Sequence, residues 1–362
     1  MLSGRILTPQ GWITGSIEFS DRVHRIIEGP AASRHTILPG FVDLHVHGAA
    51  GTDIMEGGQA GAVVARTHAR HGTTSLLGTT LTARQDHIRH ALHGLAGVIA
   101  QRPKGGARML GVHLEGPFLN PSRLGAQPPD VIPANLDFVR SLHALAPIRV
   151  LTMAPELPGH LELIPHLAAL GIRVQVGHSA GSYEDGVAAL RAGAAGFTHL
   201  FNGMSALAHR APGMVGAALA HAEYAEIIPD LEHVGPGALR AALRAIPRLY
   251  GVTDATSATG MPDGEYALGT QRVFKCGGCV RLLSGSLAGS VLTMDQALRN
   301  FVGLGLDLAD ASRRLSTYPA DYLGEHERGR LAPGAWADIV VLDSALQVVD
   351  VYVEGERIAR GD

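Results

Sequence analysis

The chain has 362 residues, of which 46% are hydrophobic and 17% charged, so it is long enough to bury one large core beside a smaller one. Its 30 basic and 33 acidic residues give a formal net charge of −3, and no basic run suggests nucleic-acid binding. The N-terminus lacks a signal-peptide pattern, and no apolar stretch reaches membrane-spanning length. Composition therefore predicts a cytoplasmic protein that binds neither nucleic acid nor a membrane.

Short β-rich segments recur along the middle of the chain. Helix-compatible stretches such as 59–72, 157–171 and 237–247 lie between them, with Ala, Leu and Arg at helical spacing and Gly or Pro as stops. This alternation predicts an α/β fold with a (β/α)₈ TIM-like barrel over residues 41–327. The barrel strands are expected at 41–46, 73–78, 108–114, 147–153, 171–177, 194–198, 225–230 and 247–253.

The two ends of the chain have a different pattern. Residues 1–40 and 328–362 contain short alternating strands separated by turn residues, with little helical pattern. We expect both ends to combine into one small β-sandwich domain beside the barrel.

Two cysteines, Cys276 and Cys279, form the sequence CGGC. Such a pair could bind a metal or take part in redox chemistry. Because residues 274–280 have the pattern of two strand ends around a Gly-Gly turn, we interpret both cysteines as reduced and structural.

Side chains that can bind a metal stand where several apolar runs end. His45 and His47 are two residues apart in a predicted strand, so they lie on one face and can hold one ion together. The other candidates each end a further strand, and the carboxyl ends of barrel strands meet at one rim. Imidazoles combined with carboxylates favour Zn²⁺, or Fe²⁺, Mn²⁺ or Co²⁺, over the all-oxygen shell of Ca²⁺. The predicted ligands are His45, His47, Glu115, His178, His199 and Asp254.

A divalent metal at the mouth of a barrel indicates hydrolysis. It lowers the pKa of a coordinated water from about 15.7 toward about 7 and polarises a carbonyl oxygen. Barrels with two metals often use a carboxylated lysine as the bridge, but Lys104 and Lys275, the only lysines, end no predicted barrel strand. Glu115 is therefore the predicted bridge between the histidine pair of the first strand and the histidines of the fifth and sixth. Asp254, at the last strand, is the predicted acid–base residue.

Longer motifs resemble one known family. The strings PGFVDLHVHG, HLEGPFLNP, GHS, THLFNGMS, VTDATSATGMPDGEY and LAGS, closed by PGAWADIVVLD, resemble the N-acetylglucosamine-6-phosphate deacetylase family of the amidohydrolase superfamily, almost from end to end. The resemblance implies metal-dependent hydrolysis of the acetamide of N-acetylglucosamine 6-phosphate to glucosamine 6-phosphate and acetate, a step of amino-sugar catabolism. It also implies that Glu115, His178 and His199 hold the main metal and that Asp254 is catalytic. Some members lack the first histidine pair and keep one metal, so its presence here favours two.

The resemblance further implies residues that contact the substrate. Arg210 matches a family arginine that reaches the phosphate, in many members across the interface of a homodimer, so a homodimer is the implied assembly. The fork of donors on an arginine suits phosphate oxygens. The other implied contacts are Ala126, Gln127, Asn202, Gly203, His233, Leu287, Ala288 and Gly289.

Some positions depart from the family pattern. Gln127 stands where the family usually has a histidine near the acetyl carbonyl, and an amide there can donate a hydrogen bond but cannot carry charge. Leu231 and Glu232 also differ from the usual pattern, and Glu232 would oppose a phosphate unless it points away. His113 shares a strand face with Glu115, where it either supports the site or simply packs.

Two other functions remain open on the sequence. A related metal-dependent amidohydrolase that acts on another N-acyl or cyclic amide, such as an N-acyl-amino-acid deacylase, is kept open by Gln127 and Glu232. A catalytically inactive barrel that serves as a binding or scaffold protein is less favoured, because such a protein is expected to lose its ligands and all six are present.

Overall fold

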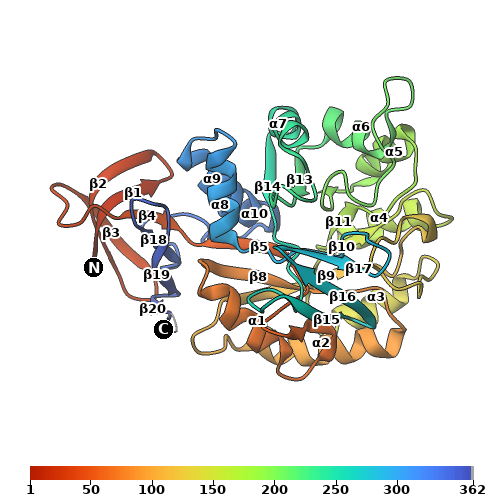
Figure 1. Cartoon of the computed structure of the whole chain (residues 1–362), viewed down its shortest axis with the longest axis horizontal. Coiled ribbons are helices and arrows are strands. Elements are labelled where there is room, and N and C mark those ends of the chain that lie inside the picture. The colour runs from red at the N-terminus through yellow and green to blue at the C-terminus, as the bar shows by residue number, and fades with distance from the viewer. Residues whose placement is uncertain (360–362) are drawn as a thin grey trace.

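A (β/α)₈ barrel forms the larger part of the computed structural model, which describes residues 1–359 (Figure 1). Six parallel strands form one sheet in chain order, and the last two strands pair with each other. Two hydrogen bonds close the ring: Leu200 N–H donates to the carbonyl of Glu226, and Asp254 N–H donates to the carbonyl of His45. The barrel strands are β5 (Phe41–Val46), β8 (Thr73–Thr80), β9 (Arg108–Glu115), β10 (Ile148–Met153), β11 (Arg173–Val176), β12 (Gly196–Phe197), β13 (Tyr224–Ile227) and β14 (Arg248–Gly251).

Helices cover the outside of the barrel, and the stretches expected to be helical correspond to α1, α4 and α7. Figure 1 shows α1 and α2 along the lower edge of the molecule. The start of α5 follows from a capping box in which Ser182 and Asp185 each accept from the other's backbone N–H. The helices are α1 (Ala60–Ala69), α2 (Gln85–Ala100), α3 (Leu136–His143), α4 (His160–Ala169), α5 (Tyr183–Ala192), α6 (Gly213–His221), α7 (Pro236–Ala245), α8 (Met294–Gly303), α9 (Leu308–Leu315) and α10 (Thr317–Leu323), with short 3-10 helices at η1 (Ile54–Glu56) and η2 (Pro121–Arg123).

The barrel strands are enclosed on both faces. Every residue of β5 and β8 is buried, as expected of parallel strands covered by helices. Their order matches the prediction, but β12 and β13 are shorter than the predicted 194–198 and 225–230. The backbone leaves the extended conformation soon after β12, because His199 has a φ of 27°. Apolar runs thus extend beyond the strands themselves and into the turns of the rim.

Both ends of the chain form one seven-stranded sheet beside the barrel (Figure 1), so the expected small β domain is confirmed. Ile6 and Ile339 belong to a core of its own, whereas the neighbouring Val340 joins the barrel core. The boundaries 1–40 and 328–362 remain our proposal, and residues 360–362 lie outside the described residues. The strands are β1 (Leu2–Thr8), β2 (Gly11–Phe19), β3 (Val23–Glu28), β4 (Thr36–Pro39), β18 (Ile339–Leu342), β19 (Val348–Val353) and β20 (Glu356–Arg357).

A three-stranded antiparallel sheet follows β14 and was only partly foreseen. Cys276 pairs with Cys279 across a turn of Gly277 and Gly278, both of which have positive φ, so the hairpin is confirmed. Both cysteines are free thiols. The other small strands are β6 (Gly48–Ala49) and β7 (Thr52–Asp53), and the three-stranded sheet consists of β15 (Gly264–Leu268), β16 (Gln271–Cys276) and β17 (Cys279–Leu282).

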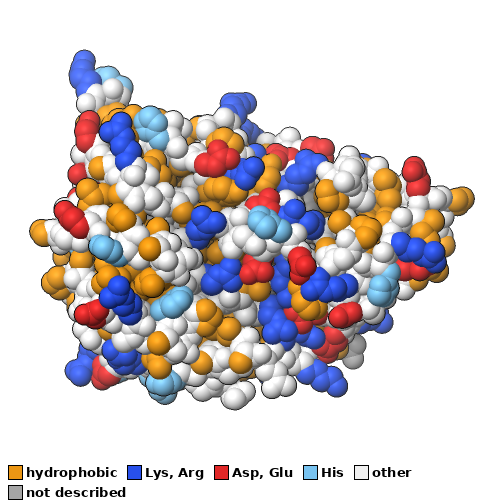
Figure 2. Space-filling model, turned by 180° about the vertical axis from the view of Figure 1, so that it is seen from behind, with side chains coloured by type: hydrophobic (Ala, Val, Ile, Leu, Met, Phe, Trp, Pro, Cys, Tyr) orange, Lys and Arg blue, Asp and Glu red, His pale blue; other side chains and the backbone are white. Residues whose placement is uncertain are grey.

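On one face of the molecule, neither basic nor acidic side chains predominate. On the face in Figure 2, basic, acidic and apolar side chains are interleaved, in keeping with the net charge of −3. Across residues 1–359, each helix is too short or too polar to cross a membrane.

An ion-pair network joins the barrel to the β domain. Glu354 accepts hydrogen bonds from Arg108 of β9 at 2.8 Å and from Arg328 at 2.6 Å, and Arg328 also pairs with the buried Asp338 at 2.6 Å. Burial by itself would raise the pKa of Glu354, but Arg108 and Arg328 outweigh it and lower the pKa to about 2. The carboxylate therefore stabilises the folded state.

We expect Glu354→Gln to reduce the free energy of unfolding by about 2 kcal/mol at neutral pH, because the guanidinium groups of Arg102, Arg108 and Arg328 lose a charged partner. The folded-state pKa is lowered from 4.5 to about 2. The contribution is therefore complete above about pH 4.5 and is lost as the pH falls toward about 2. Urea unfolding across this range measures it. The control is Glu327→Gln, because Glu327 is 64% exposed and its pair with Arg22 should contribute less than about 1 kcal/mol. Equal losses in the two variants would contradict the prediction.

Candidate functional site

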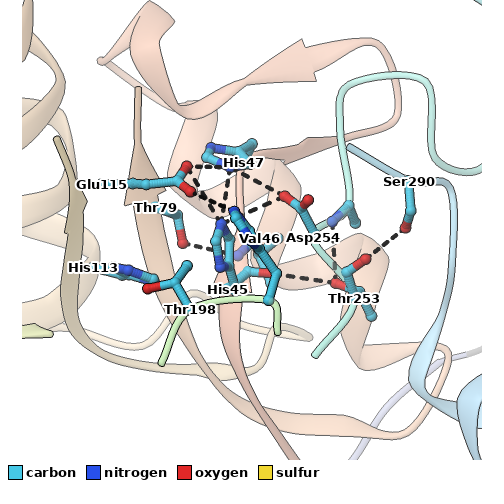
Figure 3. Close-up of polar contacts among 12 residues, drawn as sticks. His45, Val46, His47, Thr79, His113, Glu115, Thr198, Thr253, Asp254 and Ser290 are labelled. Carbon is cyan, nitrogen blue, oxygen red and sulfur yellow. Dashed lines mark hydrogen bonds and ion pairs between the residues drawn. The ribbon is translucent and has the colours of Figure 1, made fainter. Parts of the chain in front are cut away.

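The predicted ligands converge at the carboxyl-terminal rim of the barrel, at a cavity of about 240 Å³. All are buried, and each lies at or just beyond the end of a barrel strand. Figure 3 shows His45, His47, Glu115 and Asp254 directed toward one another. The strand order of the barrel thus brings together side chains that are far apart in the sequence.

Glu115 lies between two groups of histidines, with one carboxylate oxygen toward each. Its Oε1 lies 3.0 Å from Nε2 of His178 and 3.1 Å from Nε2 of His199. Its Oε2 lies 3.5 Å from Nε2 of His45 and 3.2 Å from Nε2 of His47. This is the placement that a bridging carboxylate requires.

The spacing of these donor atoms fits a divalent metal. The Nε2 atoms of His45 and His47 are 3.1 Å apart, as are those of His178 and His199. Two imidazoles that meet in this way share at most one hydrogen bond, yet each pair also faces a carboxylate. A tetrahedral metal with bonds of about 2.0–2.1 Å holds its ligand atoms about 3.3 Å apart, close to these separations. The residues present can therefore hold a divalent metal ion.

Buried negative charge also favours a cation here. Burial would lower the pKa of His47, but Asp254 and Glu115 outweigh it and raise the pKa to about 9. Burial would raise the pKa of Asp254, but His45 and His47 lower it to about 2. Asp254 is therefore ionised at neutral pH, and its surroundings stabilise positive charge.

Strained backbone directs three of the predicted ligands into the site. His178, His199 and Asp254 have φ values of 48°, 27° and 51°. Residues other than glycine rarely adopt this region, at a cost of about 1–3 kcal/mol each. The turn immediately after each strand directs the side chain over the rim. Sequence reasoning found these residues at strand ends but could not reveal the strained backbone.

Neighbouring segments hold Asp254 in place. Thr253 donates its hydroxyl hydrogen to the buried Asp43 at 2.6 Å, and Ser290 N–H donates to the carbonyl of Asp254 at 2.7 Å. Figure 3 shows the Ser290 hydroxyl, which donates to the carbonyl of Thr253 at 2.5 Å. Gly289 permits this close approach, because a Cβ there would lie 2.9 Å from the Asp254 carbonyl oxygen.

Most of the predicted substrate residues line the same cavity, but Ala288, which is buried, and Arg210, which is exposed, lie outside its lining. Glu232, which departs from the family pattern, is also exposed and outside the lining. Glu232 therefore does not face the cavity from within. The predicted contacts that do line it are Ala126, Gln127, Asn202, Gly203, His233, Leu287 and Gly289.

Gln127 holds the carboxylate of Glu115, a contact that sequence reasoning missed. Its amide nitrogen donates to Oε2 of Glu115 at 2.5 Å, and its oxygen accepts from Thr82 N–H at 2.7 Å. His233 is oriented in a similar way, because its Nδ1 pairs with Asp230 at 2.6 Å. Hydrogen bonds therefore hold both side chains in the cavity wall, Gln127 through both ends of its amide and His233 through Nδ1.

His113 lies beneath the site. Its Nδ1 donates to the carbonyl of Leu44 at 3.0 Å, and its Nε2 lies 2.7 Å from the hydroxyl of Thr152. Burial lowers its pKa to about 4, so the ring is neutral. Both nitrogens are therefore occupied by the barrel interior, and neither is directed to Glu115.

Comparison with known proteins identifies the family of this chain. The Amidohydrolase family model matches residues 36–358, so the chain belongs to the amidohydrolase family. It is 40% identical to the N-acetylgalactosamine-6-phosphate deacetylase of Escherichia coli O157:H7, covering 97% of each protein. It is 38% identical to the N-acetylglucosamine-6-phosphate deacetylase of Vibrio furnissii, covering 89% of this chain and 82% of that protein.

Solved structures similar to this chain point to the same family. A mutant N-acetyl-D-glucosamine-6-phosphate deacetylase of Mycobacterium smegmatis, in complex with N-acetyl-D-glucosamine-6-phosphate, has a TM-score of 0.92 at 33% identity and covers 99% of each chain. The N-acetylglucosamine-6-phosphate deacetylase of Thermotoga maritima has a TM-score of 0.93 at 30% identity, over 100% of this chain and 99% of that one. More narrowly, the chain therefore belongs to the N-acetylglucosamine-6-phosphate deacetylase family.

These comparisons confirm the family, the (β/α)₈ fold and the hydrolase class expected from the sequence. They favour neither a deacylase of N-acyl-amino acids nor an inactive scaffold. The family is metal-dependent, and the histidine and carboxylate groups described above could hold the metal.

Proposed function

We propose that the protein hydrolyses the acetamide of N-acetylglucosamine 6-phosphate to glucosamine 6-phosphate and acetate. The observation that carries this proposal is Glu115 between two pairs of histidines, with Asp254 at the same cavity. The relatives described above support the substrate. The proposed cofactor is one or two divalent ions per chain, Zn²⁺ in preference to Fe²⁺, Mn²⁺ or Co²⁺, because imidazole and carboxylate ligands suit it.

Asp254 is the proposed proton carrier. A divalent ion, when bound, supplies the charge that activates a water and polarises the acetamide carbonyl. The carboxylate of Asp254, ionised and 3.2 Å from Nε2 of His47, accepts a proton from the attacking water. It returns that proton to the sugar nitrogen as the C–N bond breaks, so that acetate and the free amine leave.

A second candidate substrate is N-acetylgalactosamine 6-phosphate. The E. coli relative that is named for this sugar phosphate is 40% identical over 97% of the chain. The two sugars differ only in the configuration at C4, so the acetamide chemistry at the metal is the same for both.

Acetate release from the metal-loaded protein tests the function. We expect cleavage of N-acetylglucosamine 6-phosphate, with kcat/KM for its C4 epimer deciding between the two candidates. The unphosphorylated sugar, as control, should react with a much lower kcat/KM because it lacks the anionic anchor. Cleavage of N-acyl-amino acids with neither sugar phosphate accepted would overturn the proposal.

Asp254→Asn should lower kcat by about 10² or more, because the amide cannot accept or return the proton. An ion held by Glu115, His178 and His199 should remain bound, and substrate binding should remain near normal, since the side chain keeps its size. Steady-state kinetics together with metal analysis measure both effects. A kcat within a few-fold of the unaltered protein would remove Asp254 from this role.

The phosphate is proposed to be bound by Arg210 of a partner subunit in a cytoplasmic homodimer. Among residues 1–359, no arginine or lysine lines the cavity, so a phosphate must meet positive charge from elsewhere. Arg210 is exposed in the segment between Gly203 and α6, where it is available for such a contact. Its forked donors suit phosphate oxygens.

Arg210→Ala should raise KM for the sugar phosphate more than it lowers kcat, because the contact binds ground state and transition state alike. Arg244→Ala, which changes another exposed arginine, is the matched control. If Arg210 acts across an interface, mixing Arg210→Ala with Asp254→Asn subunits should restore activity at one site per mixed dimer. An unchanged KM would show that Arg210 does not contact the substrate. If mixing the two variants restored no activity, Arg210 would act within its own chain.

A further inference from the structure

Glu226 is a fully buried carboxylate beneath the histidine cluster, and neither the motifs nor the mechanism uses it. It stands on β13, and its Oε2 lies 3.0 Å from Nδ1 of His45. Its Oε1 accepts from the amide nitrogen of Gln175 at 3.1 Å and from the hydroxyl of Tyr250 at 3.3 Å. Its two oxygens therefore have separate partners.

The opposite nitrogen of His45 faces the site. Nε2 of this ring lies 3.4 Å from Oδ1 of Asp254 and 3.1 Å from Nε2 of His47, on the Oε2 side of Glu115. We call an ion held at this side the second ion, and an ion held by Glu115, His178 and His199 the first ion. His45 thus connects Glu226 to the place of the second ion.

We propose that Glu226 is a positioning residue that holds His45 for the second ion and thereby makes the site binuclear. This inference rests on the metal-dependent function proposed above. The step is geometric: a carboxylate can only accept a hydrogen bond, so Nδ1 of His45 carries the hydrogen. The lone pair of Nε2 then faces the ligand cluster, in the tautomer that binds a metal.

The other histidines of the cluster lack this support. Nδ1 of His178 lies 2.8 Å from the backbone carbonyl of Arg123, which is a neutral acceptor. Nδ1 of His47 and of His199 has no hydrogen-bond partner among the described residues. Among these four histidines, His45 is the one whose Nδ1, on the side away from Glu115, is paired with a carboxylate, and such a partner both orients the imidazole and raises its basicity.

A purely structural role for Glu226 makes a different prediction. Through Gln175 and Tyr250, its Oε1 joins β13 to β11 and β14, and loss of these bonds would loosen the barrel as a whole. A weaker contact, 3.4 Å from His199 N–H to Oε2, also reaches toward the first ion. Removing one bond at each oxygen separates the two roles.

The test compares Glu226→Gln with Tyr250→Phe in the full-length protein. Glu226→Gln keeps the size of the side chain but removes the charge that faces His45, whereas Tyr250→Phe removes only the hydroxyl at Oε1. Zinc content and chelator competition measure how many ions are bound and how tightly. The reference variants His47→Asn and His178→Asn, which change one histidine at the place of the second and of the first ion respectively, identify which ion is lost. Acetate release is recorded separately.

We expect two ions in the unaltered protein and in Tyr250→Phe. Glu226→Gln should bind the second ion about 10–100-fold more weakly and the first within a few-fold, which is the scale for loss of such a supporting partner. Any of three results would overturn the inference. The second ion could bind Glu226→Gln as tightly as it binds the unaltered protein, both ions could be lost equally from that variant, or the unaltered protein could hold a single ion. The first two outcomes leave deacetylation intact, whereas two ions without acetate release would overturn the proposed function alone.

If Glu226→Gln does not fold, the unaltered zinc-loaded protein still tests the inference. In ¹⁵N-histidine NMR spectra, the ring signals that vanish in His45→Asn should show hydrogen on Nδ1 and none on Nε2. Hydrogen on Nε2 of His45 would overturn it.

Discussion

The site depends on the position of one carboxylate, that of Glu115, between histidines from β5, β11 and β12. Each oxygen faces a different pair of imidazoles, so a shift of β9 along the barrel would break both groups at once. Gln127 and the buried strand ends hold this carboxylate from one side. The rest of the rim can be understood as the scaffold that keeps two oxygens and four rings in register.

This scaffold is polar where an ordinary barrel would be apolar. Glu226, Gln175 and Thr198 form a hydrogen-bonded chain inside the barrel, beneath the histidines. Buried polar groups are costly unless fully paired, and here pairing also orients the rings above them. Left-handed backbone at three of the predicted ligands adds strain that the surrounding structure must hold. Stability is thus given up locally so that the donor atoms meet.

Much of the fold and of the ligand set could be predicted from the sequence. The alternation of apolar strands and helices is a local pattern, and the two-residue spacing of His45 and His47 predicts that they lie on the same face of their strand. Glu226 could not be found in this way, because its partner His45 is 181 residues away and a glutamate in a short strand has the pattern of a solvated position. The contact of Gln127 with Glu115 was missed for the same reason, since it depends on how a loop folds back over the rim.

The pairing of β4 with both ends of the chain has a consequence for biosynthesis. This strand pairs with β1 along one edge and with β18 along the other, and β18 begins 300 residues later at Ile339. During synthesis that edge, with its unpaired N–H and C=O groups, therefore has no strand to pair with until residues 339–342 have been made. The sheet can be completed only after that point, because it joins strands that precede the barrel in the sequence to strands that follow it.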